Sequence, residues 1–282
     1  MKIIVTGSAG FIGSHLVKAL KERGDVVLEI DLKDGNDLND QLTLDWIAEK
    51  MPDADCIVNL AGTCSTPRGF TYPDEAFKNN TVATYNVMHL ARRLECHVIH
   101  VSSIKAKQKQ DDFTGSDLGY TPYGLTKKMG EMIALEWSQT YNVPVTVLRP
   151  GTIYGIGQHG SEESGWIAWF IKCLLTGQTI EIHGDGGQVR DPLYIDDFVQ
   201  VIVDAIDQEI MDRVLEVGGM TKTTILGMVQ YMSTLVPATF RFVEERPGDI
   251  KYLTSDRKVG SKRLEDGIKE TIEYYQEHKE LL

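Results

Sequence analysis

Near its start the chain reads Thr6-Gly7-Ser8-Ala9-Gly10-Phe11-Ile12-Gly13, directly after the apolar run Ile3-Ile4-Val5. A strand that ends in regularly spaced glycines and continues as a helix predicts a tight turn at a helix N-terminus. The N–H groups of such a turn and the helix dipole bind a pyrophosphate. Gly7 permits the turn, Gly10 lets the backbone approach the phosphates, and Gly13 brings the helix close to the strand. The pattern predicts a dinucleotide site, although the glycines alone also fit a turn in any α/β protein.

A second apolar run, Val26 to Ile30, ends at Asp31 and indicates the second strand. In a dinucleotide site this is the position of the carboxylate that binds the adenosine ribose. Such a carboxylate accepts hydrogen bonds from the ribose hydroxyls and repels a 2′-phosphate, so we expect NAD as the cofactor. Lys33 lies two residues later and weakens that repulsion, which leaves NADP as the alternative.

Strand-length apolar runs alternate with helical segments through the first half of the chain. This alternation is typical of a parallel sheet with helices on both faces. We therefore expect an α/β protein, with a Rossmann-type doubly wound parallel sheet and a smaller C-terminal substrate lobe. Residues 1–154 are predicted to form the dinucleotide-binding domain, with 188–217 returning to it, and residues 155–187 and 218–282 the substrate-binding lobe.

The chain carries 29 basic and 41 acidic residues, for a net charge of −12, and has no basic cluster. This balance argues against a nucleic-acid or an anionic-membrane partner. The chain opens on the first predicted strand, and no apolar run approaches the ~20 residues of a membrane span, so we expect a cytoplasmic protein. The cysteines show no paired metal-ligand spacing, so we expect reduced thiols and no metal site. They are Cys56, Cys64, Cys96 and Cys173.

Tyr123 and Lys127 open a predicted helix, and their spacing places the phenol and the ammonium on one helix face. A nearby cation lowers the pKa of a tyrosine and favours the phenolate that takes a proton from a sugar hydroxyl. The strand over residues 98–101 ends at Ser102 and Ser103, at the edge where open α/β sheets bind ligands. Ser103 is placed to hydrogen-bond the reacting oxygen, although either serine also fits a plain strand-end cap.

The same spacing recurs at Tyr275 and Lys279, on a charged terminal helix. There we expect a solvated helical face rather than a site. The spacing by itself is therefore weak evidence. The place of Tyr123 after the strand that carries Ser103 favours the first pair.

These motifs, with Asn59-Leu60-Ala61-Gly62, Arg149-Pro150 and the run from Gly184 to Asp191, resemble the extended short-chain dehydrogenase/reductase family, NAD-dependent epimerase/dehydratase branch. The resemblance implies a catalytic set of Ser103, Tyr123 and Lys127, in which Lys127 also holds the nicotinamide ribose. It implies a nucleoside-diphosphate sugar as the substrate. The motif and the resemblance together assign cofactor binding to Gly7, Gly10, Phe11, Ile12, Gly13, Asp31, Asp37, Leu38, Leu60, Ala61, Gly62, Asn80, Val101, Ser102, Tyr123, Lys127 and Pro150. The substrate-binding residues that it implies are Ser65, Thr152, Arg190 and Arg246.

Arg190 and Arg246 also suit a diphosphate chemically, because a guanidinium donates paired hydrogen bonds to phosphate oxygens on this otherwise acidic protein. Surface salt bridges are the alternative for both. Thr152 stands where many members of the resembled family have an asparagine. The segment between Asp256 and Leu264 is shorter than is usual there, so the nucleotide base stays open.

Sugar 4,6-dehydratases of the resembled family carry an Asp-Glu pair directly after the catalytic hydroxyl residue, whereas this chain has Ile104-Lys105. The resemblance therefore implies epimerisation, at C4 and through a transient 4-keto sugar. One alternative is another oxidoreductase of the same scaffold: a 4-keto-sugar reductase, a dehydratase or a small-substrate dehydrogenase. The other is a non-catalytic NAD-binding protein.

Two predicted helices, Asp74 to Leu94 and Tyr123 to Tyr141, flank the strand that carries Ser103. Apolar residues recur along both at helical intervals, and they include Phe77, Tyr85, Met88, Met129, Met132, Ile133 and Trp137. In the resembled family this helix pair forms a four-helix dimer interface, so we expect a homodimer. The alternative is that both stripes cover only their own sheet.

Overall fold

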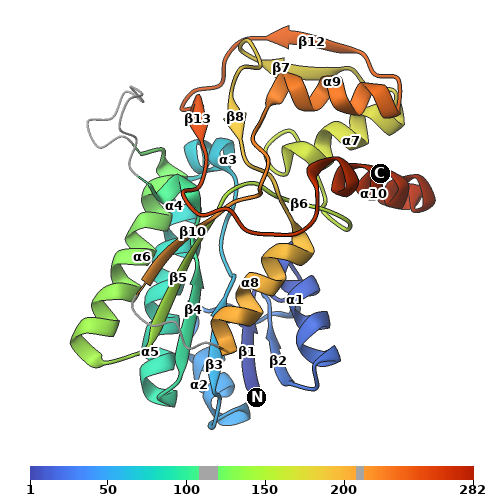
Figure 1. The fold of residues 1–282 in the computed structure, drawn as a ribbon. Coiled ribbons are helices and arrows are strands. Elements are labelled where there is room, and N and C mark those ends of the chain that lie inside the picture. Colours follow the sequence, from blue (N-terminus) through green and yellow to red (C-terminus); the bar gives the residue numbers. More distant parts are fainter. Residues whose placement is uncertain (108–119, 208–212) are drawn as a thin grey trace. The chain divides into compact units, whose positions relative to one another are not determined.

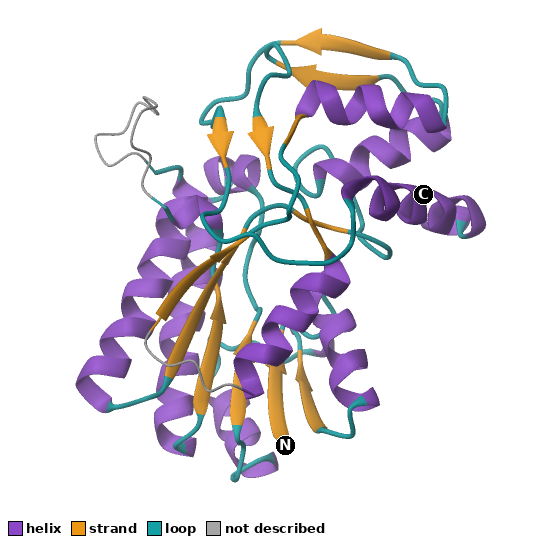
Figure 2. Cartoon of the chain, viewed as in Figure 1, coloured by secondary structure: helices purple, strands orange, loops and turns teal. Residues whose placement is uncertain are grey.

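The computed structural model describes residues 1–107, 120–207 and 213–282, as an α/β chain (Figures 1 and 2). The described residues divide into two compact units. The first comprises residues 1–107, 120–149 and the described part of 199–215, and the second comprises residues 150–198 and 216–282. The predicted assignment of one domain to the cofactor and one lobe to the substrate stays a prediction. Residues 208–212 of the predicted return segment lie outside the described residues.

A six-stranded sheet in the order β10-β5-β4-β3-β1-β2 forms the centre of the first unit. Strands β1 to β5 pair in parallel. The order reverses between β1 and β3, and open α/β sheets bind ligands at such a reversal, beyond the carboxyl ends of the strands. The predicted fold class is confirmed. The strands are β1 (Lys2–Thr6), β2 (Val26–Ile30), β3 (Cys56–Asn59), β4 (His97–Val101), β5 (Val145–Pro150) and β10 (Arg213–Val217).

Helices cover both faces of this sheet. Ile4 and Val98 are fully buried in one hydrophobic cluster with residues of α2, α5 and α6. Ile3 and Val5 are also fully buried and point to the opposite face, because side chains alternate along a strand. There α1 packs against β1 and β2 (Figure 1). The helices are α1 (Phe11–Glu22), α2 (Gln41–Lys50), α3 (Thr66–Thr71), α4 (Pro73–Phe77), α5 (Ala83–Leu94) and α6 (Pro122–Tyr141).

Local sequence explains where α6 begins and ends. The Thr121 side chain accepts a hydrogen bond from the Gly124 N–H at 3.1 Å, and Pro122 occupies the first helical position. Asn142 ends the helix in the left-handed conformation, with φ of 56°. Tyr123 therefore lies in the first turn of a capped helix.

The predicted helix Asp74 to Leu94 is not one regular α-helix. Between α4 and α5 the chain forms a π-helical turn over Lys78–Val82. Such turns often occur at functional sites, because the extra residue re-aims the side chains around it. Here the turn carries Asn80, which is 1% exposed.

The second unit contains three small sheets among its described residues: β11-β8-β13, β12-β7 and β6-β9. Helix α8 (Ile195–Asp207) begins in this unit and continues into the first. No helix among the described residues is long and apolar enough to cross a membrane. The other elements are β6 (Ile153–Tyr154), α7 (Trp166–Thr176), β7 (Ile180–His183), β8 (Val189–Arg190), β9 (Leu193–Tyr194), β11 (Thr223–Thr224), α9 (Ile225–Leu235), β12 (Phe240–Val243), β13 (Tyr252–Leu253) and α10 (Leu264–Glu277).

Candidate active site

The glycine turn predicted to bind a dinucleotide joins β1 to α1. Gly7 has a φ of +69°, and a Cβ atom on it would lie 2.9 Å from the backbone nitrogen of Ala61. A Cβ atom on Gly13 would lie 2.1 Å from the carbonyl oxygen of Gly7. Both positions therefore require glycine for the helix to pack on the turn.

The first turn of α1 offers backbone donors. Its N-cap, Gly10, makes no side-chain hydrogen bond to the helix. The N–H groups of Phe11, Ile12 and Gly13 have no acceptor within the helix, because such an acceptor would precede its first turn. This uncapped helix end fits the diphosphate of NAD.

Asp31 is fixed beside this turn. Its Oδ2 atom accepts a hydrogen bond from the Ala9 N–H at 3.0 Å, and its Oδ1 atom accepts one from the Lys33 N–H at 2.9 Å. Lys33 Nζ in turn donates to the Ala9 carbonyl oxygen at 3.1 Å. The carboxylate is partly exposed, as a ribose-binding group must be. Its contact with the ribose stays a prediction.

Leu60, Ala61 and Gly62 follow β3, the neighbour of β1 in the sheet. The Asn80 side chain holds the loop that continues from them: its Oδ1 atom accepts from the Thr63 N–H at 2.8 Å, and its Nδ2 atom donates to Thr126 Oγ1 at 3.0 Å. Both ends of this amide are thus used within the protein. Asn80 borders the predicted cofactor site by joining the loop to α6.

Asp37 and Leu38 are both predicted to bind the cofactor. Leu38 is 5% exposed and belongs to the hydrophobic cluster of the first unit. Asp37 is more exposed, and it accepts hydrogen bonds from the Asn39 N–H at 2.9 Å and from Lys78 Nζ at 3.2 Å. Their contact with the cofactor stays a prediction.

Tyr123 is 6% exposed, at the start of α6. Ser103 follows β4, and its Oγ atom accepts from the Lys105 N–H at 3.2 Å. Burial raises the pKa of Tyr123 well above its ordinary value, and Cys64 raises it further, whereas a hydrogen bond with Ser103 lowers it. The predicted lowering of this pKa is therefore wrong for the protein alone, because desolvation of the phenolate outweighs the favourable contacts.

Lys127 is 5% exposed, and its Nζ atom donates to the Val101 carbonyl oxygen at 2.7 Å. Burial lowers the pKa of Lys127 to about 8, although Glu131 and Cys64 both raise it. On β4, burial and the charge of Lys127 hold the pKa of His100 well below its ordinary value. The buried ammonium therefore faces groups from three parts of the first unit.

The sequence reasoning did not single out Glu131, which is 0% exposed and hydrogen-bonded by Ser102 Oγ at 2.7 Å. It also missed Cys64, an exposed thiol that acts on both Tyr123 and Lys127. A signal for Glu131 exists in the sequence: it lies one helical turn after Lys127, inside the apolar run from Met129 to Ile133. No local pattern marks Cys64. Pro150, predicted at the cofactor, is buried at the end of β5.

Two residues predicted at the substrate already have structural roles. Ser65, in the first unit, is 5% exposed and caps α3 by accepting from the Arg68 N–H at 3.1 Å. Arg190, in the second unit, donates to Asp249 Oδ1 and to the Ile250 carbonyl oxygen, each at 2.8 Å. Both roles at the substrate stay predictions.

Thr152 and Arg246 lie in the second unit and are partly buried. The Thr152 carbonyl oxygen accepts from the Leu193 N–H at 2.8 Å, a contact that orders the backbone after β5. A hydrogen bond from Arg241 is the main cause that lowers the pKa of Glu181, and Arg246 adds the smallest of the electrostatic contributions to that lowering. The roles of Thr152 and Arg246 at the substrate stay predictions.

Tyr275 does not lie on a solvated face, as the sequence predicted. It is 3% exposed, and its hydroxyl donates to the Gln158 carbonyl oxygen within the second unit. The helical periodicity of α10 turns Tyr275 inward, together with Ile268 and Thr271. The second Tyr–Lys match is thus a packing feature.

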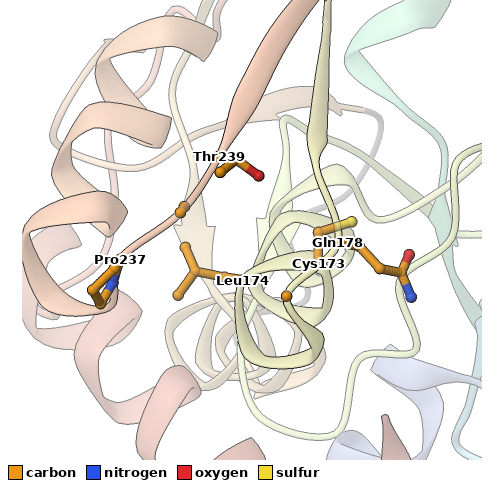
Figure 3. A pocket seen from close by; sticks show the side chains of 7 residues that line it. Cys173, Leu174, Gln178, Pro237 and Thr239 are labelled. Atoms are coloured by element: carbon orange, nitrogen blue, oxygen red, sulfur yellow. The ribbon is translucent and has the colours of Figure 1, made fainter.

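A small pocket of about 170 Å³ lies in the second unit, between the end of α7 and the start of β12 (Figure 3). Cys173, Leu174 and Pro237 line it, together with Gln178 and Thr239 (Figure 3). It carries no charged side chain and none of the predicted site residues. We assign it no role in the site.

A family model described as the NAD dependent epimerase/dehydratase family matches residues 3–218. Among curated proteins, the chain is 25% identical to the dTDP-glucose 4,6-dehydratase of Neisseria meningitidis, over 99% of this chain and 94% of that protein. It is also 25% identical to the putative UDP-glucose 4-epimerase of Methanocaldococcus jannaschii, over 96% of this chain and 97% of that protein.

Among solved structures, the UDP-glucuronic acid 4-epimerase from Bacillus cereus, in complex with UDP-glucuronic acid and NAD, is 26% identical. It superposes with a TM-score of 0.85, over 99% of this chain and 100% of that one. The matches confirm the predicted resemblance, the fold class and the NAD cofactor.

Proposed function

The chain belongs to the NAD dependent epimerase/dehydratase family, and on that basis we propose that it epimerises a nucleotide sugar at C4. The relatives include both dehydratases and epimerases, so family membership alone does not select the reaction. The choice depends on the side chains that follow Ser103.

The two residues after Ser103 carry no carboxylate. Ile104 is 3% exposed, in a short 3₁₀ turn. Lys105 Nζ donates to Thr66 Oγ1 at 2.6 Å. Elimination of water from a sugar needs an acid for the leaving hydroxyl and a base for the neighbouring C–H. A buried aliphatic group and a bound ammonium replace the acidic pair of the dehydratases, and this observation carries the proposal.

Epimerisation needs a proton to leave and return to one sugar hydroxyl, and Tyr123 is the proposed group. Tyr123 acts as the phenolate, which the hydrogen bond with Ser103 stabilises, and its Oη atom becomes a neutral hydroxyl when it takes the proton. Lys127 supplies a buried positive charge one helical turn away. When bound, NAD would supply the reversible hydride transfer that this chemistry needs at the sugar carbon.

The glycine turn, with the first-turn N–H groups of α1, is the proposed site of the NAD diphosphate. Asp31 is proposed to bind the adenosine ribose, and Lys127 the nicotinamide ribose. Arg190 and Arg246 are proposed to bind the diphosphate of the substrate, because a guanidinium donates paired hydrogen bonds to phosphate oxygens. The nucleotide-sugar substrate, the cytoplasmic location and the homodimer belong to the same proposal.

The test begins with purified protein that is denatured to release and identify its cofactor. Native protein is then incubated with UDP and dTDP sugars, and the products are separated and their molecular masses are measured by mass spectrometry. A C4 epimer with the mass of the substrate supports the proposal. A product lighter by one water identifies a dehydratase, and steady NADH accumulation identifies a dehydrogenase. NAD binding without turnover of any sugar favours a non-catalytic protein.

A further inference from the structure

Glu131 is a fully buried carboxylate outside the catalytic set proposed above. Its Oε1 atom accepts hydrogen bonds from Ser102 Oγ and from Arg149 Nε, each at 2.7 Å. Its Oε2 atom accepts from Arg149 Nη2 at 2.6 Å and from Lys128 Nζ at 3.2 Å. An ionised carboxylate has about four acceptor positions, and here all of them are used.

These bonds join α6 to two strand ends. Ser102 directly follows β4 and precedes Ser103, and Arg149 is the second-last residue of β5. One helical turn before Glu131, Lys127 Nζ binds the carbonyl oxygen of Val101. Helix α6 is therefore tied to β4 at two consecutive residues. Figure 1 shows α6 running beside the strands that supply these contacts.

We propose that Glu131 is a positioning residue for the Tyr123–Lys127 pair: it fixes α6 against the ends of β4 and β5 and supplies the negative charge that the buried Lys127 ammonium faces. The inference rests on the roles proposed above for Tyr123 and Lys127. Glu131 itself touches neither the cofactor nor the substrate in this account.

The electrostatics agree with this geometry. Burial is the main effect on the pKa of Lys127, and Glu131 is the first of the charges that oppose it. From the other elements, Cys64 after β3 also raises this pKa, and His100 on β4 is held neutral by burial and by Lys127. Removing the Glu131 charge therefore disfavours the ammonium form of Lys127.

The experiment is an NMR titration of the Lys127 side chain in full-length protein labelled at lysine, with the signal assigned from Lys127→Met. Glu131→Gln is expected to lower the pKa of Lys127 by about one pH unit. Arg149→Gln breaks the same ion pair but keeps the carboxylate charged, so there the pKa does not fall. Equal shifts in the two variants, or no shift in Glu131→Gln, would overturn the inference.

A double variant keeps the inference testable if Glu131→Gln does not fold. Glu131→Gln leaves the Arg149 guanidinium without its counter-charge, whereas Glu131→Gln/Arg149→Gln leaves neither charge unpaired. Because Glu131 contributes most among the groups that raise the pKa of Lys127, the double variant is also expected to lower this pKa. An unchanged titration in the double variant counts against the inference. Lys128→Ala is the control, because it removes only a partly exposed contact to the same carboxylate. In this variant the pKa of Lys127 is expected to stay unchanged.

Turnover supplies an independent measurement. Loss of a buried negative charge lowers the pKa of each group that faces it, so the pH profile of kcat/KM in Glu131→Gln moves to lower pH. If Glu131 had a purely structural role, Glu131→Gln would lower the maximum of kcat/KM without shifting the profile along the pH axis. Protein that epimerises no sugar contradicts the proposed function, and the titration still decides the role of Glu131.

Discussion

Lys127 Nζ donates a hydrogen bond to the carbonyl oxygen of Val101 over 2.7 Å, and both residues are buried. The bond holds an ammonium group at the carboxyl end of β4, two residues before Ser103. It connects a side chain from α6 with the strand that carries the proposed hydroxyl residue. The proposed catalytic residues thus meet through a contact between two elements.

We expect Lys127→Ala to lose both turnover and NAD affinity, because one ammonium serves the phenolate and the ribose in the proposed site. A hydrogen bond to a charged group contributes about 1.5–3 kcal/mol, which corresponds to roughly a tenfold to hundredfold weaker NAD dissociation constant. Calorimetric titration with NAD measures this loss. Lys128→Ala is the matched control on the same helix, and an unaltered NAD affinity in Lys127→Ala would remove Lys127 from the cofactor site.

We expect Tyr123→Phe to keep its fold and its NAD affinity while turnover falls by ~10² or more, the usual contribution of a general acid or base. The substitution removes one hydroxyl and leaves the buried ring in place. Steady-state kinetics and a thermal melt check the two halves of this expectation. Epimerisation at the wild-type rate in Tyr123→Phe would show that another group moves the proton.

Tyr275→Phe provides the counterpart. Its hydroxyl donates to the Gln158 carbonyl oxygen inside the second unit, so its loss is expected to cost about 1 kcal/mol of folding free energy. Turnover per folded molecule stays at the wild-type level. Denaturant unfolding and kinetics on the same samples separate these effects. A loss of rate equal to that of Tyr123→Phe would show that Tyr275 takes part in the reaction.

We expect Gly13→Ala to weaken NAD binding and to destabilise the fold, by an amount on the order of 2 kcal/mol. The new methyl group would meet the Gly7 carbonyl oxygen at 2.1 Å, so the turn must shift. Gly24→Ala, beyond the other end of α1, is the control: its φ of +92° strains the backbone, but a Cβ atom there meets nothing within 4 Å. NAD affinity therefore falls in Gly13→Ala and is retained in Gly24→Ala.

We expect a homodimer through α5 and α6. Met88 of the predicted stripe is fully buried in the core, whereas Tyr85 is 41% exposed. Tyr85 packs against Trp137, with ring centroids 5.1 Å apart, and Trp137 against Tyr141 at 5.2 Å, so an aromatic row crosses both helices. Light scattering is expected to give the mass of two chains for the wild type and of one for Tyr85→Glu. A wild-type mass of one chain at micromolar concentration, with or without NAD, contradicts the dimer.

Much of the fold and the cofactor class could be predicted from sequence because both depend on local pattern. The apolar run Val26 to Ile30 is β2, and the glycines Gly7 and Gly13 sit where a side chain would meet backbone. A strand alternates and a helix turns with fixed periods, so neighbouring residues carry this information. That Tyr123 and Lys127 lie on one face could likewise be predicted, because it depends only on the period of a single helix.

The tertiary structure decided what depends on contacts between distant segments. Burial reversed the predicted direction of the Tyr123 pKa, turned Tyr275 into a packing residue, and gave Glu131 its partners Ser102 and Arg149. The free energy of a charge depends on how much water surrounds it and on which opposite charges lie within a few ångströms. Residues far apart in the chain set both quantities, so the sequence determined which groups are present and the fold determined their chemistry.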